Sequence, residues 1–515
     1  MKHVLFLCLV FASIAATAQS RPNIIFIMSD DHDEGAISAY RSSLISTPNI
    51  DRLAKEGMRF TRCFVGNSIC GPSRATLLTG QHSHLNRFKT NRDRFDSSLV
   101  TLPYLLKNAG YQTAMIGKWH LVSYPTGFGY WSILPGQGQY YQPRFISMQG
   151  DTSTRHGYAT DLITSEALHW LQQVKKDQPF ALFLHHKAPH RNFMPSPRHL
   201  FNFAQRKFPE PSTLFADTSG HGVAWQLQTM TILKDLQLCS DLKVNPKDLE
   251  DIPALKPSAV EVKNYEAMMN RIPVLQRDSL LSIYAARGQI LRDKKPAGKE
   301  LLRLKYQWYM QDYMACVASV DENVGRVLDE IDRAGLRENT LVVYTSDQGM
   351  FLGENGWYDK RWMYDYSMQT PFLVRWPSVI PRSTVQTAMV QNIDWAPTLL
   401  AAAGVSIPAS MQGLSMLDLL RGRSTQLPRE YIYYHFYEYR ADHTVLPHYG
   451  IRGTRYKLIY FYTVKEWELY DLAEDPREQR NLSSSPAHQQ LLHALQEELK
   501  KQRAFYQDYE DEGDR

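Results

Sequence analysis

The sequence predicts an α/β protein: a large, mostly parallel sheet sandwiched by helices, and a smaller C-terminal α+β subdomain with an antiparallel sheet. Two observations support this fold class. Short apolar segments, typical of strands buried on both faces, alternate with segments of helical character as far as residue 403. From about Ile432 onward, aromatic residues alternate with polar ones, as in a half-buried antiparallel sheet.

Strand and helix signals alternate along the first part of the chain. Apolar segments at 23–28, 113–116 and 180–184 predict three strands. A helix is expected to begin at Thr47-Pro48 and to end at Gly57, because threonine suits the N-cap, proline the first turn and glycine the stop. Further helices are predicted at 102–106 and 159–174.

The alternation resumes after an interruption. Residues 200–310 are polar, irregular and partly helical, and we expect them to form a long insertion or a helical side lobe. They are followed by a predicted helix at 313–331, a strand at 341–345 and a helix at 393–403. Strands that alternate with helices form βαβ units, which make a parallel sheet with helices on both faces.

The C-terminal part has a different pattern. Three alternating aromatic segments, at 431–439, 449–462 and 467–472, predict the antiparallel sheet. A final amphipathic helix follows, and the acidic residues 508–512 are expected to be a solvated, frayed tail. We therefore predict a main domain over residues 19–425, which includes the insertion, and a C-terminal subdomain over residues 426–515.

The N-terminus has the pattern of a secretory signal peptide over residues 1–18. Lys2 precedes an apolar segment at 4–16, and Ala16-Thr17-Ala18 has the small residues of a cleavage site. No later apolar segment reaches the length of a membrane span, so we expect none. The sequence predicts an exported protein, either periplasmic or secreted.

The composition is that of an ordinary globular protein. Of the 515 residues, 43% are hydrophobic and 22% are charged, which allows a large core. The net charge of +5 is spread along the chain, and so predicts neither nucleic-acid nor membrane binding. Four cysteines remain after residue 18, too few for a disulfide scaffold in a chain of this length: Cys63, Cys70, Cys239 and Cys316.

The most informative segment is CGPSRATLLTG, at residues 70–80. Pro72 suits the first helical position, so Cys70 is expected at a helix N-terminus, where unpaired N–H groups favour negative charge. Arg74 lies one turn further and is expected to face back toward Cys70. Such a place suits an anionic nucleophile or an anionic substrate.

Two polar pairs directly follow predicted strands. Asp30-Asp31 follows the first strand, and Asp347-Gln348 follows the strand at 341–345. Ligand sites in open α/β sheets form outside the carboxyl ends of the strands. Acidic groups gathered there repel one another unless a cation lies between them, and a hard divalent cation with oxygen ligands fits that need.

These segments resemble the motifs of the type I, formylglycine-dependent sulfatases of the alkaline phosphatase superfamily. Residues 70–80 match that family's signature at every fixed position, and Asp30, Asp31, Asp347 and Gln348 match its calcium ligands. The resemblance implies an alkaline-phosphatase-like fold and oxidation of Cys70 to formylglycine by a maturase. It also implies Ca²⁺ bound by these four residues and the modified Cys70. Many members carry Asn or His in place of Gln348, but an amide oxygen also ligates calcium.

Three further segments match family motifs and contain the remaining predicted catalytic residues. They are GKWHL at 117–121, HHKAPH at 185–190 and DKR at 359–361. The resemblance implies that Lys118 and Lys360 bind sulfate oxygens and that Arg74, with Lys118, holds the formylglycine hydrate. It also implies that His190 protonates the departing sugar oxygen and that His120 removes a proton from the hydrate.

The resemblance is strongest to bacterial carbohydrate sulfatases of the N-acetylglucosamine-6-sulfatase type. It implies a sulfated carbohydrate substrate, with 6-O-sulfated N-acetylglucosamine favoured. Asp359 and Arg361 flank Lys360, so we expect them at the sugar ring. His448 precedes a predicted strand and is expected in a loop over the sugar, and His186 is the alternative to His190.

Other functions stay open at this point. One is a sulfatase for sulfated galactose or N-acetylgalactosamine, and another is a phosphonate or phosphate ester hydrolase of the same superfamily. A non-catalytic binder of sulfated glycans would require the loss of a catalytic residue, and none is missing from the motifs.

Overall fold

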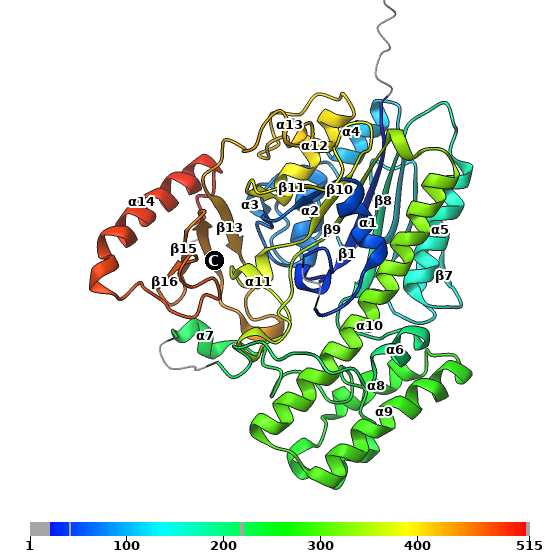
Figure 1. Ribbon diagram of the computed structural model, residues 1–515, viewed down its shortest axis with the longest axis vertical. Helices are drawn as coiled ribbons and strands as arrows, with labels where there is room; N and C mark the ends of the chain where they lie inside the picture. The colour runs from blue at the N-terminus through cyan, green and yellow to red at the C-terminus, as the bar shows by residue number, and fades with distance from the viewer. Residues whose placement is uncertain (1–20, 41–42, 217–220, 511–515) are drawn as a thin grey trace, which may run out of the picture.

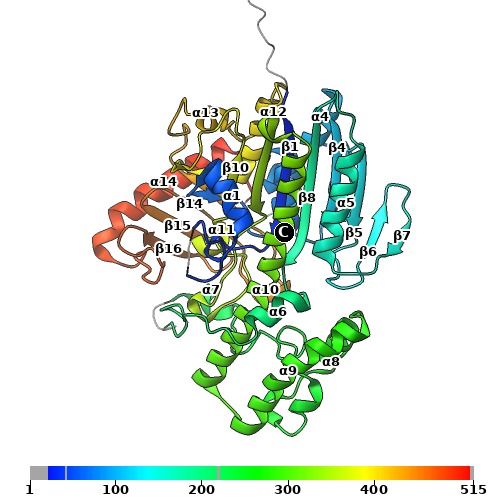
Figure 2. The same cartoon turned by 45° about the vertical axis from the view of Figure 1, so that its right-hand side comes forward.

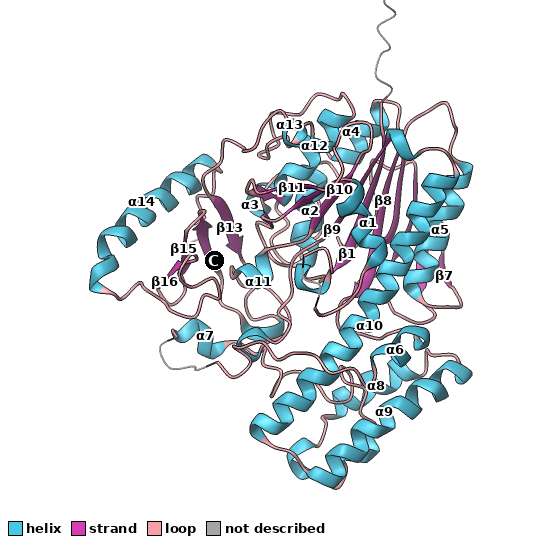
Figure 3. Cartoon of the chain, in the orientation of Figure 1, coloured by secondary structure: helices cyan, strands magenta, loops and turns pink. Residues whose placement is uncertain are grey.

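The computed structural model of the chain describes residues 21–40, 43–216 and 221–510. Its main feature is a ten-stranded sheet with the order β11-β2-β10-β9-β1-β8-β4-β5-β6-β7. A four-stranded antiparallel sheet, β13-β14-β15-β16, lies apart from it and belongs to the C-terminal part of the chain (Figures 1 and 3). These two sheets confirm the predicted fold class. The predicted signal peptide, residues 1–18, lies outside the described residues.

The bounds of the elements follow the chain. The strands are β1 (Asn23–Asp30), β2 (Met58–Phe60), β3 (Cys63–Phe64), β4 (Gln112–Lys118), β5 (Tyr130–Leu134), β6 (Arg144–Ser147), β7 (Thr152–Thr154), β8 (Phe180–Pro189), β9 (Thr340–Ser346), β10 (Phe372–Arg375), β11 (Thr384–Gln386), β12 (Val390–Gln391), β13 (Ile432–Phe436), β14 (His448–Arg452), β15 (Tyr456–Phe461) and β16 (Glu466–Asp471). The helices are α1 (Pro48–Glu56), α2 (Cys70–Thr79), α3 (Ser83–Asn86), α4 (Leu102–Asn108), α5 (Ala159–Gln173), α6 (Pro197–Phe203), α7 (Val223–Leu227), α8 (Ala259–Met269), α9 (Val274–Lys294), α10 (Gly298–Arg333), α11 (Asp365–Met368), α12 (Trp395–Ala402), α13 (Leu417–Leu420) and α14 (Gln489–Phe505).

The central strand β1 is apolar from Ile24 to Met28 because it is covered on both faces. Ile25 and Ile27 pack into the core beneath α1, α5 and α10, whereas Phe26 and Met28 pack into the core beneath α2, α4 and α12. Its neighbours β8 and β9 both run parallel to it. Figure 2 shows α1, α5 and α10 in front of the sheet. The alternation of strands and helices in the sequence therefore corresponds to a helix–sheet–helix sandwich.

Both sides of the large sheet contain antiparallel pairs, which were not predicted, although the outermost pair β11-β2 is parallel. On one side β10 runs antiparallel to both β9 and β2, and on the other β6 runs antiparallel to both β5 and β7. These strands have three to five residues each. Segments of that length have too few residues for a clear periodicity, so the sequence does not distinguish them from loops.

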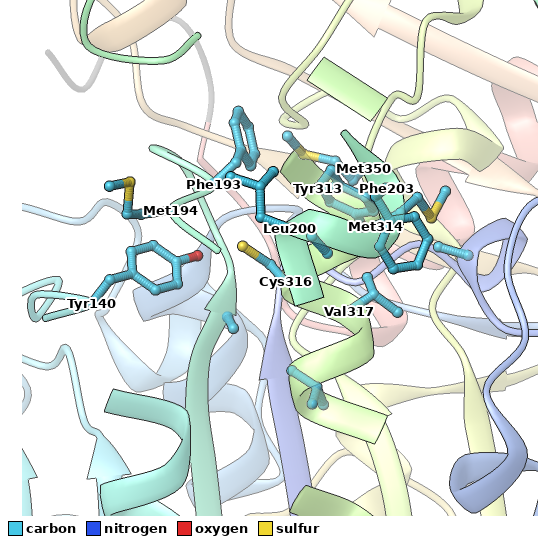
Figure 4. Close-up of a cluster of buried hydrophobic side chains, with 14 of the residues drawn as sticks. Tyr140, Phe193, Met194, Leu200, Phe203, Tyr313, Met314, Cys316, Val317 and Met350 are labelled. Carbon is cyan, nitrogen blue, oxygen red and sulfur yellow. The ribbon is translucent and has the colours of Figure 1, made fainter. Parts of the chain in front are cut away.

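The interrupting segment forms a lobe that shares a helix with the sheet. α10 is a single helix of 36 residues that begins at Gly298, not near Tyr313 as predicted. Its C-terminal half packs on the sheet, while its N-terminal half lies with α8 and α9 below it in Figure 1. We call α8, α9 and this N-terminal half of α10 the helical lobe. Where α10 meets the segment after β8, Phe193, Met194, Tyr313 and Cys316 belong to one buried cluster (Figure 4).

The C-terminal sheet is covered by α14, whose Leu495 and Leu499 pack with Tyr433, Ile451 and Leu458. The predicted continuous segment at 449–462 is two strands, β14 and β15, separated by a turn. Among the described residues, none of the helices combines the length and the apolar character needed to cross a bilayer.

The prediction of a frayed tail was wrong for Asp508. This residue is buried, and its Oδ2 accepts hydrogen bonds from Tyr433 Oη at 2.5 Å and His435 Nδ1 at 2.7 Å. Glu510 beyond it forms an ion pair with Lys89. A carboxylate with such partners is stabilised in the interior, so acidic composition alone does not identify a solvated tail.

Candidate active site

Four neighbouring parallel strands, in the order β9-β1-β8-β4, end at the same edge of the large sheet. Asp30 is the last residue of β1 and Lys118 the last of β4, while Asp347 directly follows β9. β8 ends just before His190. Parallel topology therefore gathers residues that are hundreds of positions apart in the sequence.

Three buried carboxylates form the centre of this edge. Oxygens of Asp30, Asp31 and Asp347 all lie within 4.8 Å of one another. Gln348 Nε2 donates to Asp31 Oδ1 at 2.5 Å, while Gln348 Oε1 is buried and has no hydrogen-bond partner. Three carboxylates and an unpartnered amide oxygen make a donor set that fits a hard divalent cation such as calcium.

Each carboxylate also lies beside a side-chain cation. Lys118 Nζ contacts Asp30 Oδ2, Lys360 Nζ lies 2.6 Å from Asp31 Oδ2, and Arg74 Nη2 lies 2.8 Å from Asp347 Oδ2. Burial opposes the ionisation of Asp30, but these cations, Lys118 foremost, hold the pKa of its carboxyl well below the ordinary value. By contrast, burial and then the charge of Asp30 raise the pKa of Asp347 to about 7. The carboxylates therefore still repel one another although each has a cationic neighbour, and a divalent cation among them would relieve that repulsion.

Cys70 is the first residue of α2 and is completely buried. Its Sγ donates to Asp30 Oδ1 at 3.3 Å, so the side chain lies against the carboxylate cluster. Pro72 is the third helical residue rather than the first, a shift of two positions that leaves Cys70 at the helix N-terminus. Burial, followed by the charge of Asp30, raises the pKa of the Cys70 thiol, which makes the unmodified thiol a poor nucleophile.

Arg74 connects the helix to two strand ends. Besides its bond to Asp347, it donates from Nη1 to the carbonyl oxygen of Lys118 at 2.8 Å. Arg74 thus fixes α2 against the sheet, whereas the sequence predicted only that it would face back toward Cys70. His185, whose Nδ1 lies 3.4 Å from Arg74 Nη1, is a further neighbour.

The predicted histidines separate into two groups. His190 Nε2 lies 3.7 Å from Asp31 Oδ2, and its Nδ1 donates to the Arg191 carbonyl at 2.5 Å, so that Nε2 faces the cluster. His120 follows Lys118 and is half-buried, and burial lowers the pKa of both imidazoles. His186 points to the other face of β8, where Asp161 and Arg326 are the charges that affect it, and the structure does not bring it to the site.

A second group lies beside Lys360. Asp359 Oδ2 lies 3.1 Å from His443 Nε2, and Asp359 Oδ1 lies 3.3 Å from Arg361 Nε. Arg361 Nη1 donates to Glu438 Oε1 at 3.0 Å. His443 and Glu438 were missed from the sequence. His443 lies in the polar turn between two aromatic segments, and Glu438 lies near the end of the first of these segments.

The expected position of His448 was wrong. It belongs to strand β14 and is completely buried, with its ring packed against Tyr434 and Phe461. Its Nε2 accepts from the Met363 N–H at 3.1 Å, and its Nδ1 donates to the Leu446 carbonyl at 2.8 Å. With both nitrogens satisfied inside an aromatic core, His448 has no side-chain atom left for a sugar. His443, rather than His448, is the histidine that lies beside Asp359.

Comparison with known protein families decides the identity. Residues 22–405 match the family model described as Sulfatase, and residues 353–505 match the model described as N-sulphoglucosamine sulphohydrolase, C-terminal. The chain belongs to the sulfatase family. It is therefore a sulfuric ester hydrolase, and the cluster at the strand ends is its candidate active site.

Several relatives are similar over nearly the whole sulfatase. An N-acetylglucosamine-6-O-sulfatase of Bacteroides thetaiotaomicron is 46% identical over 94% of this chain and 87% of the relative. The solved structure of BT4656 in complex with its substrate D-glucosamine-2-N,6-O-disulfate has a TM-score of 0.91 at 44% identity, covering 96% of this chain and 100% of that one. A phosphonate monoester hydrolase of Agrobacterium radiobacter, with a TM-score of 0.66 at 19% identity over 94% of this chain and 96% of that one, shares the fold.

We predict that His448→Ala destabilises the sulfatase without changing its substrate preference. Loss of the ring leaves a cavity and an unpaired Met363 N–H, which together cost about 2–4 kcal/mol. Thermal unfolding is the measurement, with His493→Ala on the exposed face of α14 as the control. An unchanged unfolding temperature together with a lower turnover would return His448 to the substrate site.

Proposed function

We propose that this sulfatase is exported and removes the 6-O-sulfate from N-acetylglucosamine units of glycans. The observation that carries the substrate assignment is the 46% identity to an N-acetylglucosamine-6-O-sulfatase over 94% of the chain. The complex of BT4656 with a 6-O-sulfated glucosamine supports the same assignment. The signal-like N-terminus supports export.

Cys70 is proposed to be converted to formylglycine, which, when present, supplies the hydroxyl nucleophile for attack on sulfur. Two observations support the conversion. The segment 70–80 has the full sulfatase signature, and the unmodified thiol is buried with a raised pKa. A thiol of this kind does not act as an anionic nucleophile at neutral pH.

The metal proposed for the carboxylate cluster is Ca²⁺. Asp30, Asp31, Asp347 and Gln348 would hold it, together with the side chain at position 70. The ion would supply positive charge next to the sulfate and the nucleophile. The unpartnered Oε1 of Gln348 supports this donor set.

The remaining residues have roles that follow from their positions. Lys118 and Lys360 place two ammonium groups beside Cys70, from where they bind the sulfate oxygens and stabilise charge on them. His190 presents Nε2 to the cluster and is the proposed acid for the departing sugar oxygen, a role that requires the imidazolium form, with a proton on Nε2 in addition to the one on Nδ1. His120 is the proposed base that would remove a proton from the hydrated side chain at position 70, and Arg74 holds Asp347 and the end of β4 in place.

Sugar recognition is assigned to Asp359, Arg361 and His443. The three side chains are buried, and both Arg361 and His443 contact Asp359. Asp359 and Arg361 adjoin Lys360 in the sequence. Hydrogen bonds from such charged groups to ring hydroxyls reject an epimer, because the wrong sugar leaves a buried polar group unpaired.

We expect intact-peptide mass spectrometry of active enzyme to show an aldehyde in place of the thiol at position 70. Cys70→Ala should fold normally and lose turnover. Full activity of a preparation that carries only unmodified cysteine would disprove the proposed nucleophile. A host without the maturase provides the matched control.

We expect Asp347→Ala to lose both bound calcium and activity, because the remaining carboxylates then make a weaker site. Metal content is measured by mass spectrometry of the purified protein, independently of turnover. Asp394→Ala is unsuitable as a control because Asp394 is buried with its partner Arg429. The control replaces Asp329, whose ion pair with Arg52 lies on the surface. Calcium retained at a normal ratio by Asp347→Ala would contradict the assignment.

The substrate is tested by sulfate release from defined monosulfated sugars. We expect the highest kcat/KM on N-acetylglucosamine 6-sulfate. Little sulfate should be released from galactose 6-sulfate, and little phosphate from N-acetylglucosamine 6-phosphate. Asp359→Ala and His443→Ala should each lower kcat/KM on the preferred sugar by about tenfold or more, since a charged hydrogen bond contributes about 1–3 kcal/mol. Preference for the galactose ester or the phosphate would favour one of the alternative functions.

A further inference from the structure

A cleft of about 390 Å³ lies next to the candidate active site. Its lining combines the segment after β5, the end of β8 with the segment that follows, and residues at the end of α8 in the helical lobe. Two lining residues connect it to the site: His190, which faces Asp31, and Gln137, whose Oε1 accepts from Lys118 Nζ at 2.6 Å. The cleft is therefore continuous with the place proposed for the sulfate ester.

Lys187 is a buried cation in the lining of this cleft. It lies near the end of β8, and only 4% of its surface is exposed. Its ammonium makes no hydrogen bond and no ion pair with any described residue, and lies 4.8 Å from the centre of the Tyr140 ring. Burial lowers the pKa of Lys187 to about 8, so the group is still mostly protonated at neutral pH. A buried cation without a counter-ion is costly, and an anionic ligand would remove that cost.

A second cation in the lining is also without a carboxylate. Arg271, at the base of the helical lobe, donates from Nη1 to the Gln142 carbonyl at 3.0 Å and makes no ion pair with any described residue. The guanidinium of Arg191, by contrast, is neutralised by two bonds to Asp241, at 2.7 and 2.8 Å. Asp442 is the one carboxylate among the described lining residues, and it is exposed.

The wall between these cations is rigid. Tyr140 donates to the carbonyl of His190 at 2.5 Å and stacks on Tyr158. Tyr140 and Met194, both in the cleft lining, belong to the buried cluster drawn in Figure 4. A ligand group in the cleft would meet preformed surfaces rather than a mobile loop, which reduces the entropic cost of binding.

We propose that this cleft binds a second anionic group of the glycan, a sulfate or a carboxylate, through Lys187 and Arg271. The inference rests on the proposed function, in which the first sulfate lies at Lys118 and Lys360. It assigns a role to the helical lobe, whose Arg271 completes the cleft. The enzyme would thereby prefer sugars that carry two negative groups over sugars that carry the 6-sulfate alone.

Three substrates test the proposal and distinguish the source of the second charge. N-acetylglucosamine 6-sulfate has one anionic group, glucosamine 2-N,6-O-disulfate has a second sulfate on the same ring, and a disaccharide of a uronic acid and N-acetylglucosamine 6-sulfate has a carboxylate on the neighbouring ring. We expect Lys187→Met and Arg271→Met to lower kcat/KM at least tenfold more on a doubly charged substrate than on the first one. The substrate that loses most identifies the group in the cleft.

Lys263→Met, on the exposed side of α8, is the matched control and should leave all three rates unchanged. Unfolding temperatures are measured for every variant, and Arg271→Met keeps the test available if Lys187→Met does not fold. An equal loss on all three substrates, or no loss in either variant, would overturn the proposal. If the wild type prefers galactose 6-sulfate, the proposed function fails, and the same comparison with galactose 2,6-disulfate still decides on the second anion.

Discussion

The charge balance around three buried carboxylates constrains the rest of the molecule. Parallel strands force Asp30, Asp31 and Asp347 together at one sheet edge, where burial makes their mutual repulsion costly. Cations from separate parts of the chain form ion pairs with these carboxylates: Arg74 from α2, Lys118 from β4 and Lys360 from the segment after β9. Those helices and loops must therefore pack where they do, and the same cations are available to an anionic substrate.

The C-terminal subdomain contributes to this arrangement through a series of hydrogen bonds. Glu438 accepts from Arg361 at 3.0 Å and from the N–H of Asn91 at 2.7 Å. Asn91 Oδ1 in turn accepts from the N–H of Gly71, in the first turn of α2, at 3.0 Å. The helix that carries Cys70 and the residues proposed to recognise the sugar are thus connected through one glutamate. The antiparallel sheet is part of the active-site scaffold rather than an appendage.

The sequence allowed the centre of the site to be predicted and left its periphery open. Asp30 and Asp347 follow long apolar strands, so the topology rule for parallel sheets places them correctly. His443 and His448 could not be ranked in this way, because both precede or begin an antiparallel strand and the pairing register decides which one packs into the aromatic core. The burial of Asp508 depends on its contact with His435, and the early start of α10 depends on contacts within the helical lobe. Neither kind of tertiary contact has a local signal in the sequence.

The burial of Cys70 limits when, during synthesis and folding, its side chain is accessible to another protein. The maturase proposed to oxidise this side chain needs access to it, yet in the folded protein Cys70 is fully enclosed. The segment just beyond its helix is held by residues that are synthesised long after Cys70, since Glu510 pairs with Lys89 and Asp508 lies 3.6 Å from His84. The proposed modification would therefore precede the docking of residues 508–510. Because these residues follow Cys70 at a long distance in the chain, Cys70 stays accessible during the synthesis of the intervening segments.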